Sequence, residues 1–470
     1  MQSLSGLDAF HIHEETRTQH NHTIKIAILD TSGAHNEPEL NYETFKQFFG
    51  KGISIIPPFQ WRLVSIPFGI GMPRWYYDPD LDIDYHIRRA AAPQPGGERE
   101  LAAVISDIAS HSLERDRPLW QIWFVEGLEN GQIALVTKLH HALADGRVSA
   151  KIITDSFQKS AEPVAQFPPH DYTVAEAIPD RMSLVRQAAA DDLALIMGAP
   201  RMILRTLRYI GKALWRKILR KPGYAGAFSG PATHFNQKLT PHRWYATVDL
   251  SVSDMKEVKN ILGGTLNDVF ITVASGALRP YLRKREDMPE TSLTCTVPVS
   301  LRGPEFEGFG NRVGTWFLSI ASDIDDPVER LKQVTRNTQA AREHNEACDR
   351  ELNMDWMAYR RVWSSYVGLF KGSAERLLSK PTFNLILSNV NGPREQLWQN
   401  GSKVVAIRSI GPLTEDMGLN ITCWSYMDTL NIGLVACREH MPDLWDLADQ
   451  LPVEMEKLLT AARAVSTGSE

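Results

Sequence analysis

The sequence predicts a mixed α/β protein built from two large lobes. Its 470 residues leave room for two or three packed units at roughly 150 residues each. Hydrophobic residues make up 43% of the chain and charged residues 23%, which is typical of a globular protein and excludes a fibrous or disordered one. Strand-like runs and stretches of helical periodicity alternate along both halves, so each lobe should combine a sheet with helices.

Composition also indicates the cellular compartment and the kinds of partner to expect. The four cysteines have no Cys-x-x-Cys spacing, and the first ten residues lack a charged segment followed by an apolar run, so we expect a protein of the reducing cytoplasm. No stretch approaches the roughly 18 uninterrupted apolar residues of a membrane span. The net charge of -5 argues against general affinity for nucleic acid. Contact with lipid is therefore expected only at the surface.

The first lobe is predicted to contain a hairpin that leads into a histidine pair. Apolar and β-branched residues predict a strand over 23–29, and helical spacing predicts a helix over 101–112. Strands over 120–126 and 132–139 flank an Asn-Gly pair, which favours a hairpin turn. A further helix is predicted over 147–158.

A linker is predicted between the lobes. Residues 160–173 are rich in Pro, Ala and polar side chains. Residues 181–221 have a helical pattern that Pro200 should break or kink and Pro222-Gly223 should end. The chain should therefore divide into a first lobe over 1–175, a helical, basic linker over 176–240 and a second lobe over 241–470.

The second lobe is predicted to begin near Trp244 and to mix strands with helices. A helix over 253–262 should be closed by two glycines, and Thr265 with Asp268 three residues on forms a capping-box-like start for the next helix. The predicted strands of this lobe are 245–250, 293–299, 315–321, 383–388, 419–426 and 429–436.

One heptapeptide carries the chemistry: His140-His141-Ala142-Leu143-Ala144-Asp145-Gly146. Adjacent residues on an extended chain point to opposite faces, so one histidine should face a site while the other supports it. An imidazole can take the proton of an alcohol as it attacks, which typically contributes about 10²–10⁴ in rate. Asp145 could orient a histidine directly or form a buried ion pair that holds the loop, and we favour the ion pair.

Other interpretations of the histidine pair remain open. The two residues could be one core and one surface side chain, or metal ligands. A metal site is less favoured because adjacent strand positions chelate poorly and no nearby Cys, His or Glu supplies a third ligand. No Gly-x-Ser-x-Gly segment marks a nucleophile, so direct transfer without an acyl-enzyme is the simpler scheme.

Beyond this motif, the chain resembles the bacterial wax ester synthase/diacylglycerol acyltransferases, members of the CoA-dependent acyltransferases marked by His-His-x-x-x-Asp-Gly. The resemblance runs nearly end to end, and the order and spacing of its segments make chance similarity improbable. The segments are LSGLDAFHIHEE at 4–15, IPPFQWRL at 56–63, DLDIDYHIRR at 80–89, PGGERE at 95–100, DRPLWQIWFVEGLENG at 116–131, TLNDVFI at 265–271, VPVSLR at 297–302 and FNLILSNVNGPRE at 383–395.

The resemblance implies a fold and a reaction. The fold would be two lobes of chloramphenicol-acetyltransferase type with an active-site tunnel between them. The reaction would move a long-chain acyl group from acyl-CoA, a substrate, to a fatty alcohol or to diacylglycerol, with no cofactor. One alternative is a related acyltransferase with another acceptor or a carrier-bound donor, as in condensation domains or polyketide-associated acyltransferases. Another is a non-catalytic protein of lipid-inclusion surfaces.

The resemblance also implies residue roles. His141 would be the general base and Asp145 a structural residue that pairs with an arginine, for which Arg302 is a candidate. Asn267 and Asp268 match the family's Asn-Asp pair and would either cap a helix or act in binding or oxyanion stabilisation.

Two further segments carry weaker expectations. Ser388-Asn389 stands before Asn391-Gly392-Pro393 and would either donate to an oxyanion or belong to a turn, and the turn is favoured. Family members often carry a Met-His-Val-Gly-like stretch where this chain has residues 21–24, Asn-His-Thr-Ile. This departure makes substrate preference less secure than reaction type.

The linker helix carries a basic stripe. Residues 201–221 include eight basic residues and no acidic one. The stripe follows steps of three and four residues, and its members are Arg201, Arg205, Arg208, Lys212 and Arg216. Such a helix is typical of docking to an anionic bilayer or lipid inclusion, so we expect peripheral attachment at the inner membrane face. The alternatives are a solvated inter-lobe helix or a site for the phosphates of CoA.

Overall fold

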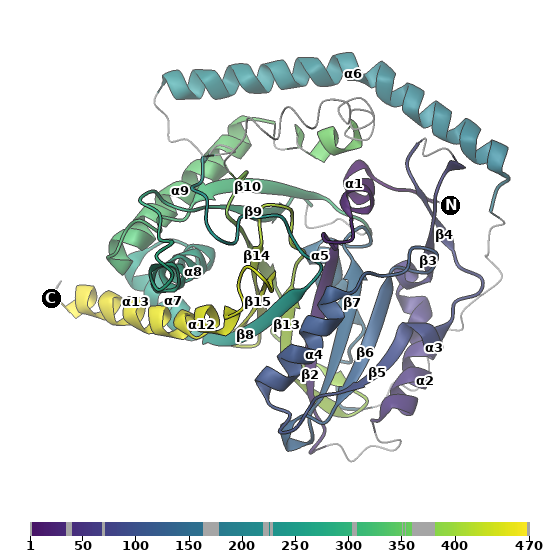
Figure 1. Cartoon of the computed structure of the whole chain (residues 1–470), viewed down its shortest axis with the longest axis horizontal. Coiled ribbons are helices and arrows are strands. Elements are labelled where there is room, and N and C mark those ends of the chain that lie inside the picture. Colours follow the sequence, from purple (N-terminus) through teal and green to yellow (C-terminus); the bar gives the residue numbers. More distant parts are fainter. Residues whose placement is uncertain are drawn as a thin grey trace.

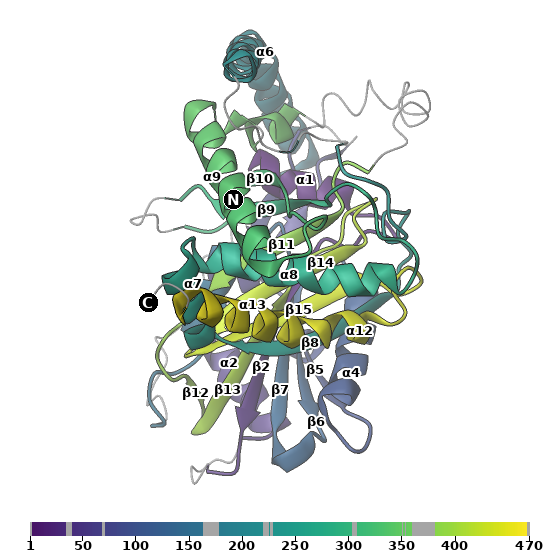
Figure 2. The same cartoon turned by 90° about the vertical axis from the view of Figure 1, so that its left-hand side faces the viewer.

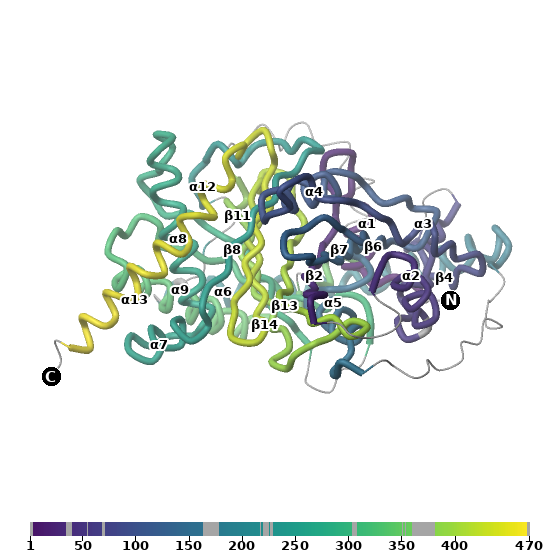
Figure 3. The backbone as a smooth tube through the Cα atoms, turned by 90° about the horizontal axis from the view of Figure 1, so that it is seen from below, coloured from purple at the N-terminus to yellow at the C-terminus, as the bar shows by residue number. Residues whose placement is uncertain are grey.

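The structure is a computed structural model, viewed along three axes in Figures 1–3. It describes residues 2–33, 40–67, 71–162, 178–219, 225, 229–302, 308–349, 351–352, 354–359 and 381–467. Most of the predicted linker over 160–173, together with Arg220 and Lys221, lies outside these residues.

The first lobe is built on a six-stranded sheet. In spatial order its strands are β12 (Trp398–Gln399), β13 (Ser402–Ile410), β2 (His22–Asp30), β7 (Ile133–His140), β6 (Trp120–Glu126) and β5 (Ile87–Ala91). All neighbours are antiparallel except β5 and β6. β6 and β7 form the predicted hairpin, and His22 of β2 pairs with His140 at the end of β7.

Helices cover both faces of this sheet. Side chains alternate along β2 and β7, so Leu29 and Leu135 face α2 (Tyr42–Gly52) and α5 (Gly146–Asp155) in one apolar core. Ile26 and Val136 face α4 (Glu98–Ser110) in another. The remaining elements of this lobe are α1 (Gly6–Glu14), α3 (Ile83–His86) and a small sheet of β1 (Gln2–Ser3), β4 (Arg74–Tyr77) and β3 (Trp61–Val64).

The second lobe is built on another six-stranded sheet. Its spatial order is β10 (Val313–Ser319), β9 (Thr294–Ser300), β11 (Leu385–Asn391), β14 (Leu419–Tyr426), β15 (Thr429–Cys437) and β8 (Arg243–Ser251). Its helices gather at the left of Figure 1 and in front in Figure 2. They are α7 (Val252–Leu262), α8 (Leu266–Arg283), α9 (Pro327–Ala347), α12 (Leu444–Ala448) and α13 (Gln450–Thr467).

A segment from the second half of the sequence belongs to the first lobe, which corrects the predicted division at residue 241. β12 and β13 follow β11 in sequence but join the first sheet, so residues 398–410 do not belong to the second lobe as expected for 241–470. β13 also packs beside β14 and β15, as Figure 3 shows from below. Trp424 and Tyr426 enter the core of the first lobe. The junction between the lobes is therefore a packed interface.

α6 (Arg181–Ile218) spans both lobes at the top of Figure 1. It continues without a break through Pro200, where we expected a break or a kink, and Figure 1 shows that it changes direction near its middle. Its first half meets the first lobe, where Arg74 pairs with Asp191 at 2.6 Å. Its second half meets α9, where Tyr209 Oη lies 3.1 Å from His344 Nε2.

A membrane-spanning helix must be long and apolar enough to cross the hydrocarbon core, and the described helices can be judged against this requirement. Taken one at a time, none of them is both long and apolar enough, and only α7 and α8 together, bent by 102°, meet these criteria.

Candidate active site

His141 lies just beyond β7, in the interior between the lobes. Its backbone N–H donates to the carbonyl of Asn21 at 2.7 Å, which continues the pairing of β7 with β2. The ring of His11 from α1 lies 4.4 Å from its ring, centroid to centroid. Its Nδ1 lies 3.1 Å from Asn311 Oδ1, contributed by the segment before β10. His141 nevertheless keeps intermediate exposure, so the protein surrounds the imidazole without covering it completely.

His140 points away from that site and is fully buried. The backbone N–H of Ala142 donates to its Nδ1 at 3.1 Å, so the ring proton of a neutral imidazole is on Nε2. That nitrogen lies 3.5 Å from Glu15 Oε2, and Glu15 also lies 3.1 Å from His22 Nε2. The opposite orientations of the two histidines follow the predicted alternation. In the described part of the chain, no group of three His, Cys, Asp or Glu is arranged to hold a metal ion.

Asp145 forms a buried ion pair with Arg302. Arg302 Nε donates to Asp145 Oδ2 at 3.1 Å, and the side chains are 3% and 1% exposed. The other carboxylate oxygen accepts from the backbone N–H of Val148 at 2.8 Å and so caps α5. Oδ2 also accepts from the backbone N–H of Arg312 at 3.0 Å. Asp145 thus joins the start of α5 to two segments of the second lobe.

Gly146 lets the second lobe approach the motif. A Cβ added at this position would lie 3.4 Å from Val390 Cγ2 of β11, so a larger side chain would press on that strand. Ser388 and Asn389 lie inside β11, paired with Thr422 and Cys423 of β14. Our preference for a turn at these two positions is therefore wrong, because the strand continues to Asn391.

Asp268 is a helix-capping residue. Its carboxylate accepts from the backbone N–H and hydroxyl of Thr265 at 2.8 and 2.9 Å, which closes a capping box at the start of α8. Its other oxygen accepts from the hydroxyl of Thr338 at 2.7 Å. Asn267 instead accepts from Asn389 Nδ2 at 3.4 Å. The Asn-Asp pair thus divides into a capping residue and a residue that meets β11.

The surroundings of His141 disfavour its cationic form. Burial, and then the charge of Lys25, lower the pKa of His141 to about 4. Burial also lowers the pKa of Lys25 to about 7. The Lys25 amine donates to the hydroxyls of Thr23 and Ser409 at 2.8 and 2.6 Å. The imidazole is consequently neutral at pH 7, which is the state that accepts a proton.

Four residues of the site were not predicted from the sequence: Asp8, His11, Lys25 and Asn311. Asp8 and His11 stand in a segment that matched the family, but nothing in their spacing linked them to His141. Asn311 lies 170 positions from His141, beyond the reach of any local pattern.

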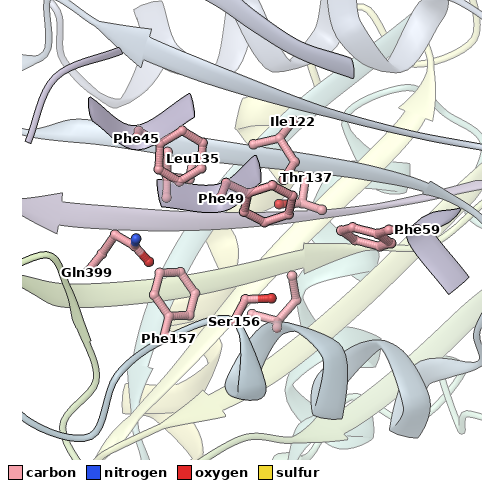
Figure 4. Close-up of a pocket in the computed structure, with 10 residues that line it drawn as sticks. Phe45, Phe49, Phe59, Ile122, Leu135, Thr137, Ser156, Phe157 and Gln399 are labelled. Carbon is pink, nitrogen blue, oxygen red and sulfur yellow. The ribbon is translucent and has the colours of Figure 1, made fainter. Parts of the chain in front are cut away.

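An apolar pocket lies between α2, α5 and the first sheet (Figure 4). It contains about 340 Å³ of space, part of it open to solvent. Its lining residues are Phe45, Phe49, Phe59, Ile122, Leu135, Thr137, Ile153, Ser156, Phe157 and Gln399. Thr137 and Leu135 share the strand face that continues to His141. They precede it by four and six residues, roughly 13 and 20 Å along an extended strand.

The predicted basic stripe on α6 does not form one outer surface. Arg205 pairs with Asp349 and Asp355 at 2.8 and 2.6 Å. Arg216 lies 3.9 Å from Glu343, and Lys212 donates to a backbone carbonyl at the end of α9. The five residues therefore do not form a single exposed stripe, because Arg205, Lys212 and Arg216 contact α9 or the segment that follows it.

The outer face of α6 is instead apolar. The exposed apolar residues of α6 from position 193 onward are Leu193, Ile196, Met197, Ile203, Leu204, Leu207, Ile210, Leu214, Trp215 and Ile218. Leu207 is 60% exposed and Ile218 70%. Arg201 and Arg208 are exposed beside this row. The described contacts thus turn several polar side chains inward and leave apolar ones outside.

The sequence matches known proteins over most of its length. Models of the wax ester synthase/diacylglycerol acyltransferase catalytic domain and of the C-terminal domain of that family match residues 4–270 and 309–459. A Mycobacterium tuberculosis protein with the provisional name diacylglycerol O-acyltransferase is 35% identical over 440 residues, which cover 93% of this chain and 91% of the relative. The O-acyltransferase WSD of Acinetobacter baylyi is 28% identical over 97% of this chain and 96% of its own.

Solved structures agree with this assignment. The wax ester synthase/diacylglycerol acyltransferase of Marinobacter aquaeolei VT8 superposes with a TM-score of 0.69 and 25% identity, covering 98% of this chain and 99% of that one. A condensation domain of the calcium-dependent antibiotic synthetase shares the fold, with a TM-score of 0.60 and 14% identity over 98% of this chain and 96% of its own. The predicted two-lobed α/β fold is confirmed. The chain belongs to the wax ester synthase/diacylglycerol acyltransferase family and is an acyltransferase.

Proposed function

We propose that this chain transfers a long-chain acyl group from acyl-CoA to the hydroxyl of a fatty alcohol or of diacylglycerol. The observation that carries the proposal is the enclosed, neutral and partly exposed imidazole of His141 at the junction of the lobes. His140 and Asp145 support it, one from the opposite face of β7 and one through the loop. CoA acts as a leaving group of the substrate, so the scheme uses no cofactor.

The proposed reaction proceeds by direct transfer. His141 Nε2 takes the hydroxyl proton as the alcohol oxygen bonds to the thioester carbon, giving a tetrahedral oxyanion and an imidazolium. The C–S bond then breaks, and the imidazolium returns the proton to the departing CoA thiolate. Ser388, Asn389 and Asn267 are the candidate donors to the oxyanion, supported by the position of β11 beside the motif.

The test compares purified variants with palmitoyl-CoA and either hexadecanol or dioleoylglycerol. Thiol release and neutral lipid are both measured. His141→Ala should lose about 10²–10⁴ in turnover, while the exposed His111→Ala serves as the matched histidine control. Equal product from wild type and His141→Ala would rule out the base.

The same assay separates the two alternatives. Turnover only with a carrier-protein thioester, or only with another acceptor, would favour the condensation-type acyltransferase. Binding to lipid without any transfer would favour a non-catalytic coat protein.

We further propose that the pocket of Figure 4 receives the far end of a long alkyl chain. The proposal is supported by its aromatic and aliphatic lining and by its place on the strand face that leads to His141. Ser156→Trp should fill the pocket and shift preference toward shorter substrates, whereas Thr154→Trp, half-buried at the same helix end but outside the lining, should not. Identical chain-length profiles for the two variants would contradict this assignment.

We also propose that α6 attaches the protein to an anionic phospholipid surface, at the inner membrane face or on lipid inclusions. The apolar outer row would enter the surface while Arg201 and Arg208 meet headgroups. Leu207→Glu removes roughly 1.5–3 kcal/mol of apolar burial, so vesicle affinity should fall about tenfold or more.

The control is Val453→Glu, an exposed apolar position on α13. Vesicles of phosphatidylcholine with and without phosphatidylglycerol test the role of charge, and neutral-lipid emulsions test inclusions. Equal sedimentation of Leu207→Glu and wild type with all three would remove the proposal.

A further inference from the structure

The amide of Asn311 occupies the space between His141 and Asp8. Its Nδ2 donates to Asp8 Oδ1 and to the backbone carbonyl of His141, both at 2.6 Å. Its backbone N–H donates to the same Asp8 oxygen at 2.8 Å. Asp8 is held in turn by Ser5, whose backbone N–H and hydroxyl donate to Oδ2. Asn311 is 6% exposed and Asp8 4%, so these contacts are shielded from water.

These contacts determine which way the amide points. A side-chain amide has two N–H donors on nitrogen and only acceptor sites on oxygen. Both of its partners at Nδ2 are oxygen acceptors, so a flipped amide would place oxygen against oxygen twice. Asn311 Oδ1 therefore faces His141 Nδ1 at 3.1 Å, and Nδ1 must carry the proton. The unprotonated nitrogen of a neutral His141 is then Nε2.

The segment that carries Asn311 is anchored to the histidine motif on both sides. The backbone N–H of Arg312 donates to Asp145 at 3.0 Å, and that of Gly310 donates to the carbonyl of Leu143 at 3.4 Å. The guanidinium of Arg302 donates to the Gly310 carbonyl. Gly310 has φ +84°, and a Cβ there would lie 3.0 Å from Asp8 Oδ2, so only glycine suits this position.

We infer that Asn311 is the positioning residue of the catalytic base: its amide oxygen holds the Nδ1 proton of His141 and so keeps Nε2 free for the substrate hydroxyl. The inference rests on the proposed role of His141. The Asp145–Arg302 ion pair then also acts on the reacting centre, because it holds the 310–312 segment that carries Asn311. A histidine whose second nitrogen is held by a fixed acceptor keeps one tautomer and one ring orientation.

The first test reverses the polarity of the contact. In Asp8→Asn/Asn311→Asp the amide at position 8 can donate to a carboxylate at 311, and that carboxylate faces Nδ1. The other groups around His141 are His11 from α1, Lys25 from β2 and the neighbouring His140 and Asp145; these four residues are unchanged.

A carboxylate beside the ring favours imidazolium, so the pKa of His141 should rise from about 4, by roughly one to three units. The acid limb of kcat/KM should move up by the same amount. Asn311→Ala should lower kcat by about 10- to 100-fold, part of the general-base contribution, with little change in KM. Asn345→Ala on α9 is the matched control, because the Asn345 amide donates to a backbone carbonyl of its own helix and does not belong to the site.

A second measurement does not depend on turnover. Carbethoxylation of histidines, resolved by peptide mass spectrometry, gives the pKa of His141 from the pH dependence of its own modification rate. A raised pKa in the double variant, with Asn345→Ala matching wild type, supports the inference even if the enzyme proves to use other substrates. An unchanged His141 pKa in the folded double variant, or undiminished kcat in Asn311→Ala, would overturn it.

Discussion

Removing Arg302 should expose how strongly the motif depends on its buried ion pair. Arg302→Met leaves the Asp145 carboxylate 1% exposed with two backbone N–H donors and no cation. Breaking one partner of a buried pair typically costs about 3–5 kcal/mol, because the remaining charge stays out of water. The matched control is Arg89→Met, whose pair with Glu126 at 2.5 Å is 62% and 32% exposed and should contribute less than about 1 kcal/mol.

The assay is urea unfolding followed by tryptophan fluorescence, together with kcat/KM. The double variant Arg302→Met/Asp145→Asn should lose less free energy of unfolding than the sum of the two single variants, by about 0.5–3 kcal/mol. The reason is that Asp145→Asn removes the buried carboxylate that Arg302→Met leaves without a cation. Activity should fall as well, since Arg302 and Asp145 both hold the 310–312 segment. If the free energies of unfolding of Arg302→Met and Arg89→Met differ by less than about 1 kcal/mol, the reasoning fails.

Three further perturbations test the electrostatics of the junction. Lys25, protonated below its pKa of about 7, lowers the pKa of His141, so Lys25→Met should move the acid limb of kcat/KM up by about one pH unit; an unmoved limb would contradict this. Burial raises the pKa of Glu15, but hydrogen bonds from two histidines outweigh it and hold that pKa well below its ordinary value. Glu15 therefore stabilises the fold above about pH 4.3 and loses this effect as pH falls through its folded pKa, so unfolding midpoints of Glu15→Gln and wild type should differ at pH 7 and converge in acid. Arg408 of β13 is 5% exposed and donates to Glu98 of α4 at 2.9 and 2.6 Å and to Asp249 of β8 at 3.1 Å. Arg408→Met should lower the free energy of unfolding by about 1.5–3 kcal/mol, as measured by urea unfolding; a smaller loss would mean that these contacts do not stabilise the junction.

Local patterns predicted the elements that lie close together in sequence. The hairpin of β6 and β7 follows from alternating apolar residues around an Asn-Gly turn. The helix predicted over 147–158 from its periodicity is α5, and the structure adds Asp145 as its cap. The motif gathers its histidines and aspartate within seven residues, and the family resemblance then implied which of the two histidines would be the base.

Long-range choices were not predictable in the same way. β13 is a strand by its own residues, yet joining the first sheet required β2 as a neighbour some 380 positions away, as in the Thr23–Ile410 bond. The periodicity of α6 predicted a basic row and an apolar row, but it did not determine which of them would pack against the rest of the protein. Asp349 and Asp355 decided this by pairing with Arg205, and the apolar row remained outside.

The sequence by itself determined the mixed α/β class, the hairpin and the histidine motif, because hydrophobic period, turn chemistry and capping act over a few residues. The ion pair of Asp145 with Arg302, 157 positions apart, was expected only from the family resemblance. Only the tertiary structure decided that Asn311 meets His141, that β13 crosses between lobes and that α6 presents its apolar face. Those outcomes depend on contacts between residues hundreds of positions apart, where many pairings have similar local preference and packing of the whole chain selects one.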